Sequence, residues 1–271
     1  MKKSLIYLFY VLAAIAAACS TTASYDSAGG LGDGGGAGKG GSMARFAIKD
    51  SCLYVVDQLT LKTFDIHIPE KPVYLQGKDL ILEQGIETIF PVDTLLFIGS
   101  RNGMYIFDVK RPLFPTRLAM VSHITSCDPV VAAGNYAYVT LNSTSKWCGT
   151  QANIMIVYDI SDPRSPREIR QLNLNSPRGL GIDGSKLFVC DNGLKVYDIT
   201  TPDDPVWVDD LSFKDDAVSN IQTYDVIPIN GILLVIGSDG FYQFDYNGDA
   251  LKLISKITVT GKEDNDEEQD N

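Results

Sequence analysis

From Met43 to about Thr260 the apolar residues come in short runs, rich in Val, Ile, Tyr and Phe, that are separated by Gly, Asn, Asp and Pro. Runs of this kind predict β-strands bounded by turns, and this part of the chain lacks the apolar spacing of an amphipathic helix. The span is long enough to bury a sizeable core in one domain. We therefore expect a single all-β domain.

The strand pattern repeats five times along this domain. Each copy contains an aromatic residue followed by an aspartate, and the aspartates stand 43, 51, 39 and 47 residues apart at Asp65, Asp108, Asp159, Asp198 and Asp245. A period of about 40 to 45 residues, with four short strands in each copy, is typical of β-propeller blades. The sequence thus predicts a five-bladed β-propeller of four-stranded antiparallel sheets. We expect the strands of each blade in chain order, with no strand exchanged at closure.

Two prolines follow the repeated aspartate with identical spacing in four of the five copies. The motif Asp-x3-Pro-x2-Pro occurs at Asp65/Pro69/Pro72, Asp108/Pro112/Pro115, Asp159/Pro163/Pro166 and Asp198/Pro202/Pro205. An aspartate at the end of a strand can accept a hydrogen bond from the amide two residues on and so begin a turn. The second proline can then open the outermost strand, where a missing N–H is harmless. The motif is therefore architectural, and the fifth copy replaces it with the glycine turn "DYNGDALK".

The N-terminus carries the parts of a secretory signal. Lys2 and Lys3 precede fourteen apolar residues, 5–18, and Cys19 follows directly. Fourteen residues are too few to cross a bilayer as a helix, which needs about 20, so the segment reads as a signal peptide. The three alanines before Cys19 resemble a bacterial lipobox, which predicts lipidation of this cysteine. The alternative is ordinary cleavage that leaves a spare thiol.

The composition divides the rest of the chain. Nine of the residues from Ser20 to Ser42 are glycine, which favours a flexible tether, and the last eleven residues carry six acids against one lysine, which favours a disordered tail. The predicted organisation is a signal peptide at 1–18, lipidated Cys19 with the tether to 42, the propeller at 43–260 and the acidic tail at 261–271.

The phrases "LFVCDNGLKVYDITTPDDP" at 187–205 and "IMIVYDISDPRSP" at 154–166 resemble the LVIVD repeat of bacterial β-propeller lipoproteins. The stretches "GGSMARF", "SCDPVV" and "RGLGIDG" are similar to exported members of the same group, so the resemblance covers about residues 40 to 258. It implies an anchored protein of the bacterial cell envelope. It implies no established activity, because the repeats that define the family form structure and not a catalytic motif.

The order of the strands assigns each connection to one end of the propeller. If the first strand of every blade starts at one end, called the top face, the connections between second and third strands lie on that face as well. Cys127, which precedes the third blade, and Cys148, in the long insertion from Asn142, then share the top face, and we predict a Cys127–Cys148 disulfide in an exported chain. Cys52 and Cys190 fall elsewhere and are expected to be free, buried thiols. The alternative is that all four are reduced core residues.

A charged residue stands at the start of the innermost strand of every blade: Arg45, Glu87, Asp128, Arg178 and Asp225. At a propeller axis these residues would form a ring at the top of the central channel. One interpretation is that they pair with one another, because crowded carboxylates need nearby cations to stay ionised. The other is a seat for a polar ligand, to which the overhanging loops would add Arg101, Asn102, Lys146 and Trp147.

These features favour a non-catalytic binding or scaffolding module that works through its top face and is held in the cell envelope by its lipid, with an envelope protein or a glycan as partner. The alternative is a carbohydrate-binding or glycosidase-like propeller that uses Glu87, Asp128 and Asp225. A hydrolase of that kind needs an acid and a base about 5 to 9.5 Å apart, and Arg45 and Arg178 would make nearby carboxylates poor general acids.

Other functions have little support in the sequence. The net charge of −11 argues against nucleic acid, which requires a basic surface. His67 and His123 show no metal-ligand spacing, and there is no nucleophile elbow or dinucleotide fingerprint. We therefore expect no cofactor, no metal and no contact with the membrane beyond the lipid.

Overall fold

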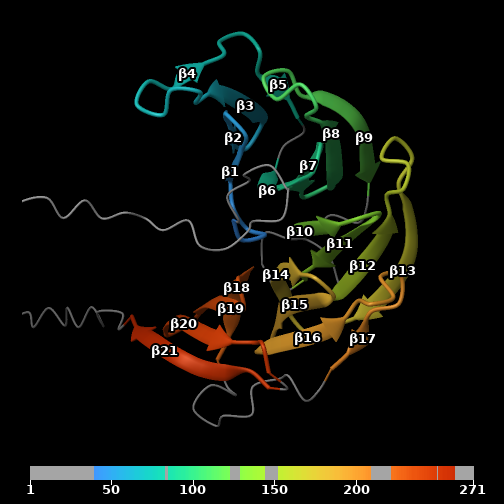
Figure 1. The fold of residues 1–271 in the computed structure, drawn as a ribbon. Coiled ribbons are helices and arrows are strands. Elements are labelled where there is room, and N and C mark those ends of the chain that lie inside the picture. Colours follow the sequence, from blue (N-terminus) through green and yellow to red (C-terminus); the bar gives the residue numbers. More distant parts are fainter. Residues whose placement is uncertain are drawn as a thin grey trace, which may run out of the picture. The chain divides into compact units, whose positions relative to one another are not determined.

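The computed structural model describes residues 40–82, 85–122, 129–143, 152–208, 221–248 and 250–259. All of them belong to one compact unit, Gly35–Asn271. They form five separate antiparallel sheets, which are the five blades of a β-propeller (Figure 1). The predicted fold class is confirmed, and no strand of the described residues is exchanged between blades.

The strands follow chain order within each blade, from the innermost to the outermost. Blade 1 contains β1 (Phe46–Lys49), β2 (Cys52–Val56), β3 (Thr60–Asp65), β4 (Val73–Tyr74) and β5 (Leu80–Ile81). Blade 2 contains β6 (Ile86–Val92), β7 (Leu95–Ser100), β8 (Gly103–Asp108) and β9 (Thr116–Ser122), and blade 3 contains β10 (Val130–Ala133), β11 (Tyr136–Leu141), β12 (Ile154–Asp159) and β13 (Arg167–Asn173). Blade 4 contains β14 (Pro177–Asp183), β15 (Lys186–Asp191), β16 (Leu194–Asp198) and β17 (Val206–Trp207), and blade 5 contains β18 (Thr223–Ile229), β19 (Ile232–Gly237), β20 (Gly240–Asp245) and β21 (Lys252–Thr258).

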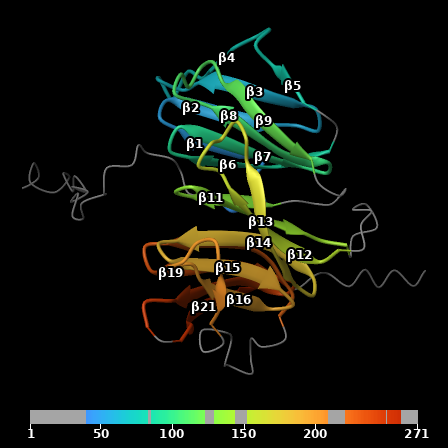
Figure 2. The same ribbon diagram turned by 90° about the vertical axis from the view of Figure 1, so that its right-hand side faces the viewer.

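Blade 1 differs from the others at its outer edge. Two short strands share the outermost position, because β4 pairs with Phe64 and Asp65 of β3 whereas β5 pairs with Thr60 and Leu61. Figure 2 shows the blades from the side, with blade 1 at the top of the view and blade 5 at the bottom.

The repeated aspartate forms the same turn in all five blades. Its Oδ1 atom accepts a hydrogen bond from the amide two residues on, over 2.7–2.9 Å, at Asp65, Asp108, Asp159, Asp198 and Asp245. The second proline of the motif directly precedes the outermost strand in blades 1 to 4. The architectural interpretation is confirmed, and blade 5 keeps the hydrogen bond although it lacks both prolines.

The core lies between the blades. Four clusters of buried side chains join blade 1 to 2, 2 to 3, 3 to 4 and 4 to 5. Two of these interfaces also carry a buried tyrosine whose hydroxyl donates to the next blade's turn: Tyr54 to the Pro112 carbonyl at 2.7 Å and Tyr138 to the Pro202 carbonyl at 2.9 Å. Buried tyrosines usually find such a partner.

Candidate binding face

The start of the first strand and the turn between the second and third strands lie at the same end of each blade. In blade 2, Ile86 of β6 pairs with Ser100 at the end of β7, and the Arg101 amide donates to the Gly85 carbonyl over 3.0 Å. The repeated aspartate turns lie at the opposite end, because Asp108 pairs with Leu95 at the start of β7. We keep the name top face for the first end and bottom face for the second.

Glu87 and Arg101 form an ion pair on the top face of blade 2. The Arg101 Nε atom lies 3.4 Å from Glu87 Oε1, and the arginine side chain is 41% exposed. Burial raises the pKa of Glu87, while the nearby charges of Arg101 and Arg45 act against the rise. The partner of Glu87 is thus Arg101, which the sequence assigned to the overhanging loops and not to the ring. Asn102 is exposed beside it in the same turn.

Among the described members of the predicted ring, Asp225 is the most buried, with 8% of its surface exposed. Its carboxylate packs against Gly41 and Gly179 so closely that a Cβ atom on either glycine would overlap it. Ser42 Oγ donates to Asp225 Oδ1 over 3.1 Å and accepts a hydrogen bond from the Leu180 amide at 2.7 Å. Burial raises the pKa of Asp225 to about 6, although hydrogen bonds from the Val226 backbone, from the Ser42 hydroxyl and from the Met43 and Ser42 backbone act against the rise.

The segment before β1 therefore connects several blades at the axis. Ser42 reaches blades 4 and 5, and the Ala44 carbonyl accepts a hydrogen bond from Ile89 of blade 2 at 2.9 Å. Gly41 and Ser42 are both buried, so the packed part of the chain begins inside the segment that composition assigned to the tether. Glycine content alone did not show that Gly41 allows the Asp225 carboxylate to approach the backbone.

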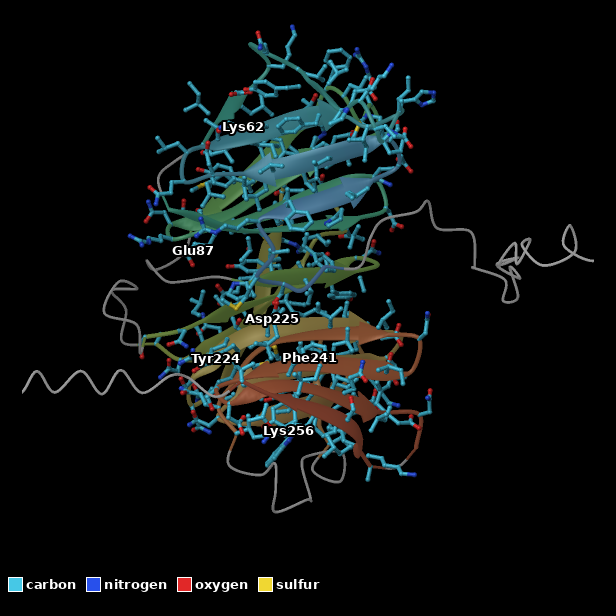
Figure 3. The ribbon with its side chains drawn as sticks, turned by 90° about the vertical axis from the view of Figure 1, so that its left-hand side faces the viewer. Lys62, Glu87, Tyr224, Asp225, Phe241 and Lys256 are labelled. Atoms are coloured by element: carbon cyan, nitrogen blue, oxygen red, sulfur yellow. The ribbon has the colours of Figure 1, made fainter. Side chains whose placement is uncertain are left out.

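Arg178 and Tyr224 form the third feature of the top face. The Arg178 guanidinium lies over the Tyr224 ring, 4.7 Å from its centroid, and both residues are half-buried. Figure 3 shows Tyr224 and Glu87 toward the same side of the molecule, with Asp225 between them in height. Tyr224 was not among the residues predicted from sequence, although its place beside Asp225 could have indicated it.

Several predicted site residues lie outside the described residues: Cys19, Cys127, Asp128, Lys146, Trp147 and Cys148. The structure describes the strands on either side of these segments. Cys127 and Asp128 belong to the connection between β9 and β10, and the long insertion connects β11 to β12. The Cys127–Cys148 disulfide and the lipidation of Cys19 remain predictions.

The two cysteines that the structure describes are free and buried, as predicted. Cys52 is the first residue of β2, and Cys190 lies near the end of β15. In the described part of the chain no three His, Cys, Asp or Glu side chains gather closely enough to hold a metal ion. The described residues also form no helix that is long and apolar enough to cross a membrane.

No protein-family model and no curated protein matches the chain. Among solved structures, a functionally unknown protein from Desulfotomaculum acetoxidans matches with a TM-score of 0.61 and 10% identity, over 84% of this chain and 71% of that one. A protein from Lactobacillus plantarum matches with a TM-score of 0.56 and 15% identity, over 77% and 68%. Apo AztD from Citrobacter koseri matches with a TM-score of 0.56 and 13% identity, over 76% of this chain. The match covers 59% of the AztD chain, which is less than two thirds of its length. Identities this low concern the fold alone, and they show that this chain shares the β-propeller fold of these bacterial proteins.

Proposed function

We propose that this protein is a non-catalytic binding module that captures its partner through the top face. The observation that carries the proposal is the set of three arginines, Arg45, Arg101 and Arg178, which come from three blades and gather at one end of an acidic protein of net charge −11. Guanidinium groups bind carboxylates and phosphates with defined geometry.

The surroundings of these arginines suit recognition. Arg45 is exposed, and the Tyr224 ring supports the Arg178 guanidinium from one side, which reduces the entropy lost when a partner binds. Within the described residues neither Arg45 nor Arg178 forms an ion pair with a carboxylate. We therefore propose an envelope protein that presents acidic side chains as the partner.

The carboxylates of the top face support binding over hydrolysis. Glu87 is held by Arg101, and the Asp225 carboxylate is enclosed by Gly41, Gly179 and Ser42. A glycosidase needs an acid and a base that both reach the substrate. Asp225 is committed to the fold, so we favour the binding function over the glycosidase-like one.

The resemblance to LVIVD-repeat lipoproteins and the signal sequence support the proposed location. We propose that Cys19 is lipidated and holds the propeller in the bacterial cell envelope, and that the glycine-rich segment from Ser20 lets the top face reach partners near the membrane. Labelling of Cys19 with a lipid precursor in the native host tests the anchor.

Capture from envelope extracts, with the full chain as bait, tests the binding function. The double variant Arg45→Ala/Arg178→Ala should lower the yield of a defined protein at least about tenfold, since two charged contacts together contribute more than about 1.4 kcal/mol. The matched control is Arg111→Ala/Arg164→Ala, which removes the same charge from the bottom face. Like Arg178, Arg111 lies over an aromatic ring, 5.1 Å from the Phe114 ring centroid. Equal yields from the two variants would contradict the proposal.

A further inference from the structure

The last strand of the propeller ends at the top face. β21 forms the outer edge of blade 5 (Figure 1), and its Thr258 pairs with Gly240, which follows the top-face turn between β19 and β20. The Val259 amide donates to the Asp239 carbonyl of that turn over 3.0 Å. The chain that follows Val259 therefore starts at the same end of the molecule as the arginines of the proposed binding site.

The repeat shows how much chain is needed to cross the top face from the outer edge to the axis. The outermost strand of blade 3 ends at Asn173, the innermost strand of blade 4 begins at Pro177, and residues 174–176 connect them. Thr258 corresponds to Asn173, because each pairs with the first residue of its blade's third strand. The acidic tail at 261–271 is several times longer than this connection. Its length is therefore sufficient to reach the axis.

The acidic tail carries the charge that complements the arginines. Its six acids are Glu263, Asp264, Asp266, Glu267, Glu268 and Asp270. Glu263 stands five positions after Thr258, and the same five positions lead from Asn173 to Arg178 at the start of the next blade. By the spacing of the repeat, the acids begin where the chain can first reach the axis.

Arg45 and Arg178 differ from the other cations near the top face in lacking a carboxylate partner. Four cations of the described residues each pair with a carboxylate there: Lys62 with Asp57, Arg101 with Glu87, Lys195 with Asp191 and Lys256 with Asp239. Within the same part of the chain, Arg45 is exposed and Arg178 contacts only the Tyr224 ring with its charge. These two guanidinium groups are therefore the sites at which an acidic segment would gain most.

We propose that the acidic tail lies on the top face of its own chain and that its carboxylates bind Arg45 and Arg178 in competition with the acidic partner. This inference rests on the binding function proposed above and adds a regulator to it. A short tether holds the tail at an effective concentration on the order of mM, so even weak ion pairs form for much of the time. A partner with several contacts can still displace the tail.

Arginine modification in the full chain tests the contact. Phenylglyoxal reacts with guanidinium groups, and peptide mass spectrometry gives the rate at each arginine. The test variant, called the amide variant, neutralises the tail through Glu263→Gln, Asp264→Asn, Asp266→Asn, Glu267→Gln, Glu268→Gln and Asp270→Asn.

Arg45 and Arg178 should react at least about threefold faster in the amide variant than in the native chain at low salt. This factor is expected when the effective concentration of the tail is about twice the dissociation constant of the contact. The difference should disappear at about 1 M salt, where the Debye length is only about 3 Å. Arg111, which is exposed on the bottom face, is the internal control and should keep its rate.

A second variant separates the charge of the tail from its exact sequence. Exchange of every tail Asp for Glu and every tail Glu for Asp keeps the charge, so it should keep the slow reaction of Arg45 and Arg178. Equal rates in the native chain and the amide variant would overturn the proposal. Protection that is lost on dilution from about 50 to about 1 μM would also overturn it, because a contact within one chain does not depend on concentration.

Capture from envelope extracts distinguishes this proposal from the binding function itself. At limiting bait, the amide variant should capture at least about threefold more of the defined protein than the native chain. If Arg45→Ala/Arg178→Ala lowers capture but the amide variant changes neither capture nor arginine reactivity, the tail proposal is wrong and the binding function stands. If the tail protects both arginines but Arg45→Ala/Arg178→Ala captures as much as its bottom-face control, the binding function is wrong and the tail contact stands.

Discussion

The Ser42 hydroxyl donates a hydrogen bond to the Asp225 carboxylate over 3.1 Å, although 183 positions separate the two residues in the chain. Both are almost completely buried, with 1% and 8% of their surfaces exposed. The contact joins the segment before the first strand to the last blade, and its buried carboxylate makes the stability of the ring depend on pH.

Asp225→Asn should change the pH dependence of unfolding. Burial raises the folded-state pKa of Asp225 from 3.8 to about 6. The contribution of the protonated Asp225 side chain to the free energy of unfolding is therefore fully present below pH about 4, and it is lost as pH rises through about 6. The free energy of unfolding of the native protein, minus that of the variant, should therefore fall by about 3 kcal/mol between those limits. Urea unfolding at several pH values measures it, and a difference that stays constant or rises would contradict the assignment.

Ser42→Ala separates the hydrogen bond from the charge. The change leaves the Leu180 amide without its acceptor and removes one donor from Asp225, which should cost about 1 to 3 kcal/mol of unfolding free energy. Because the Ser42 hydrogen bond lowers the pKa of Asp225, its loss should also move the pH-dependent step upward. Ser165→Ala, at an exposed turn position, is the control and should change neither quantity.

Tyr54→Phe and Tyr138→Phe should each lower the free energy of unfolding by about 1 kcal/mol, because each leaves a proline carbonyl of the next blade without its donor. Phenylalanine fits, since Phe97 and Phe188 occupy the equivalent positions of blades 2 and 4 with no exposed surface. The two changes affect different interfaces, so their effects should add within about 0.5 kcal/mol. Strong non-additivity in urea unfolding of the double variant would contradict independent interfaces.

Cys52 and Cys190 should be chemically inert in the folded protein. Burial raises the pKa of Cys52 to about 11 and raises that of Cys190 as well, so little thiolate forms near neutral pH. Iodoacetamide at pH about 8 should leave both thiols unmodified until guanidinium unfolds the chain, as read by peptide mass spectrometry. Rapid modification at either position under native conditions would show that the surrounding interface opens.

The sequence predicted the blades because their chemistry is local. The aspartate that ends each third strand and the proline that opens the fourth fix the turns within a few residues, and the apolar runs between them need no distant partner to be recognised. The five repeated aspartates therefore located the strands. The prediction that Cys52 and Cys190 are free, buried thiols is also confirmed.

The axial contacts could not be predicted in the same way. Arg45, Glu87, Arg178 and Asp225 were assigned to one end of the propeller by strand order, but which of them pair depends on the distances between blades. Nothing near Ser42 in the sequence indicates that it meets Asp225, and the glycines on either side of the carboxylate looked like those of any linker or strand. Non-local packing decided the role of each residue.

Every aspartate turn on the bottom face is completed by its own backbone, because Asp65 and Asp245, in the first and last blades, make the same hydrogen bond as those between them. If a whole repeat were duplicated, the copy would therefore contain every residue that its aspartate turn needs. Growth of the ring by gene duplication would leave these turns unchanged, whereas the contacts of Ser42 with Leu180 and Asp225 link different blades and would have to adapt.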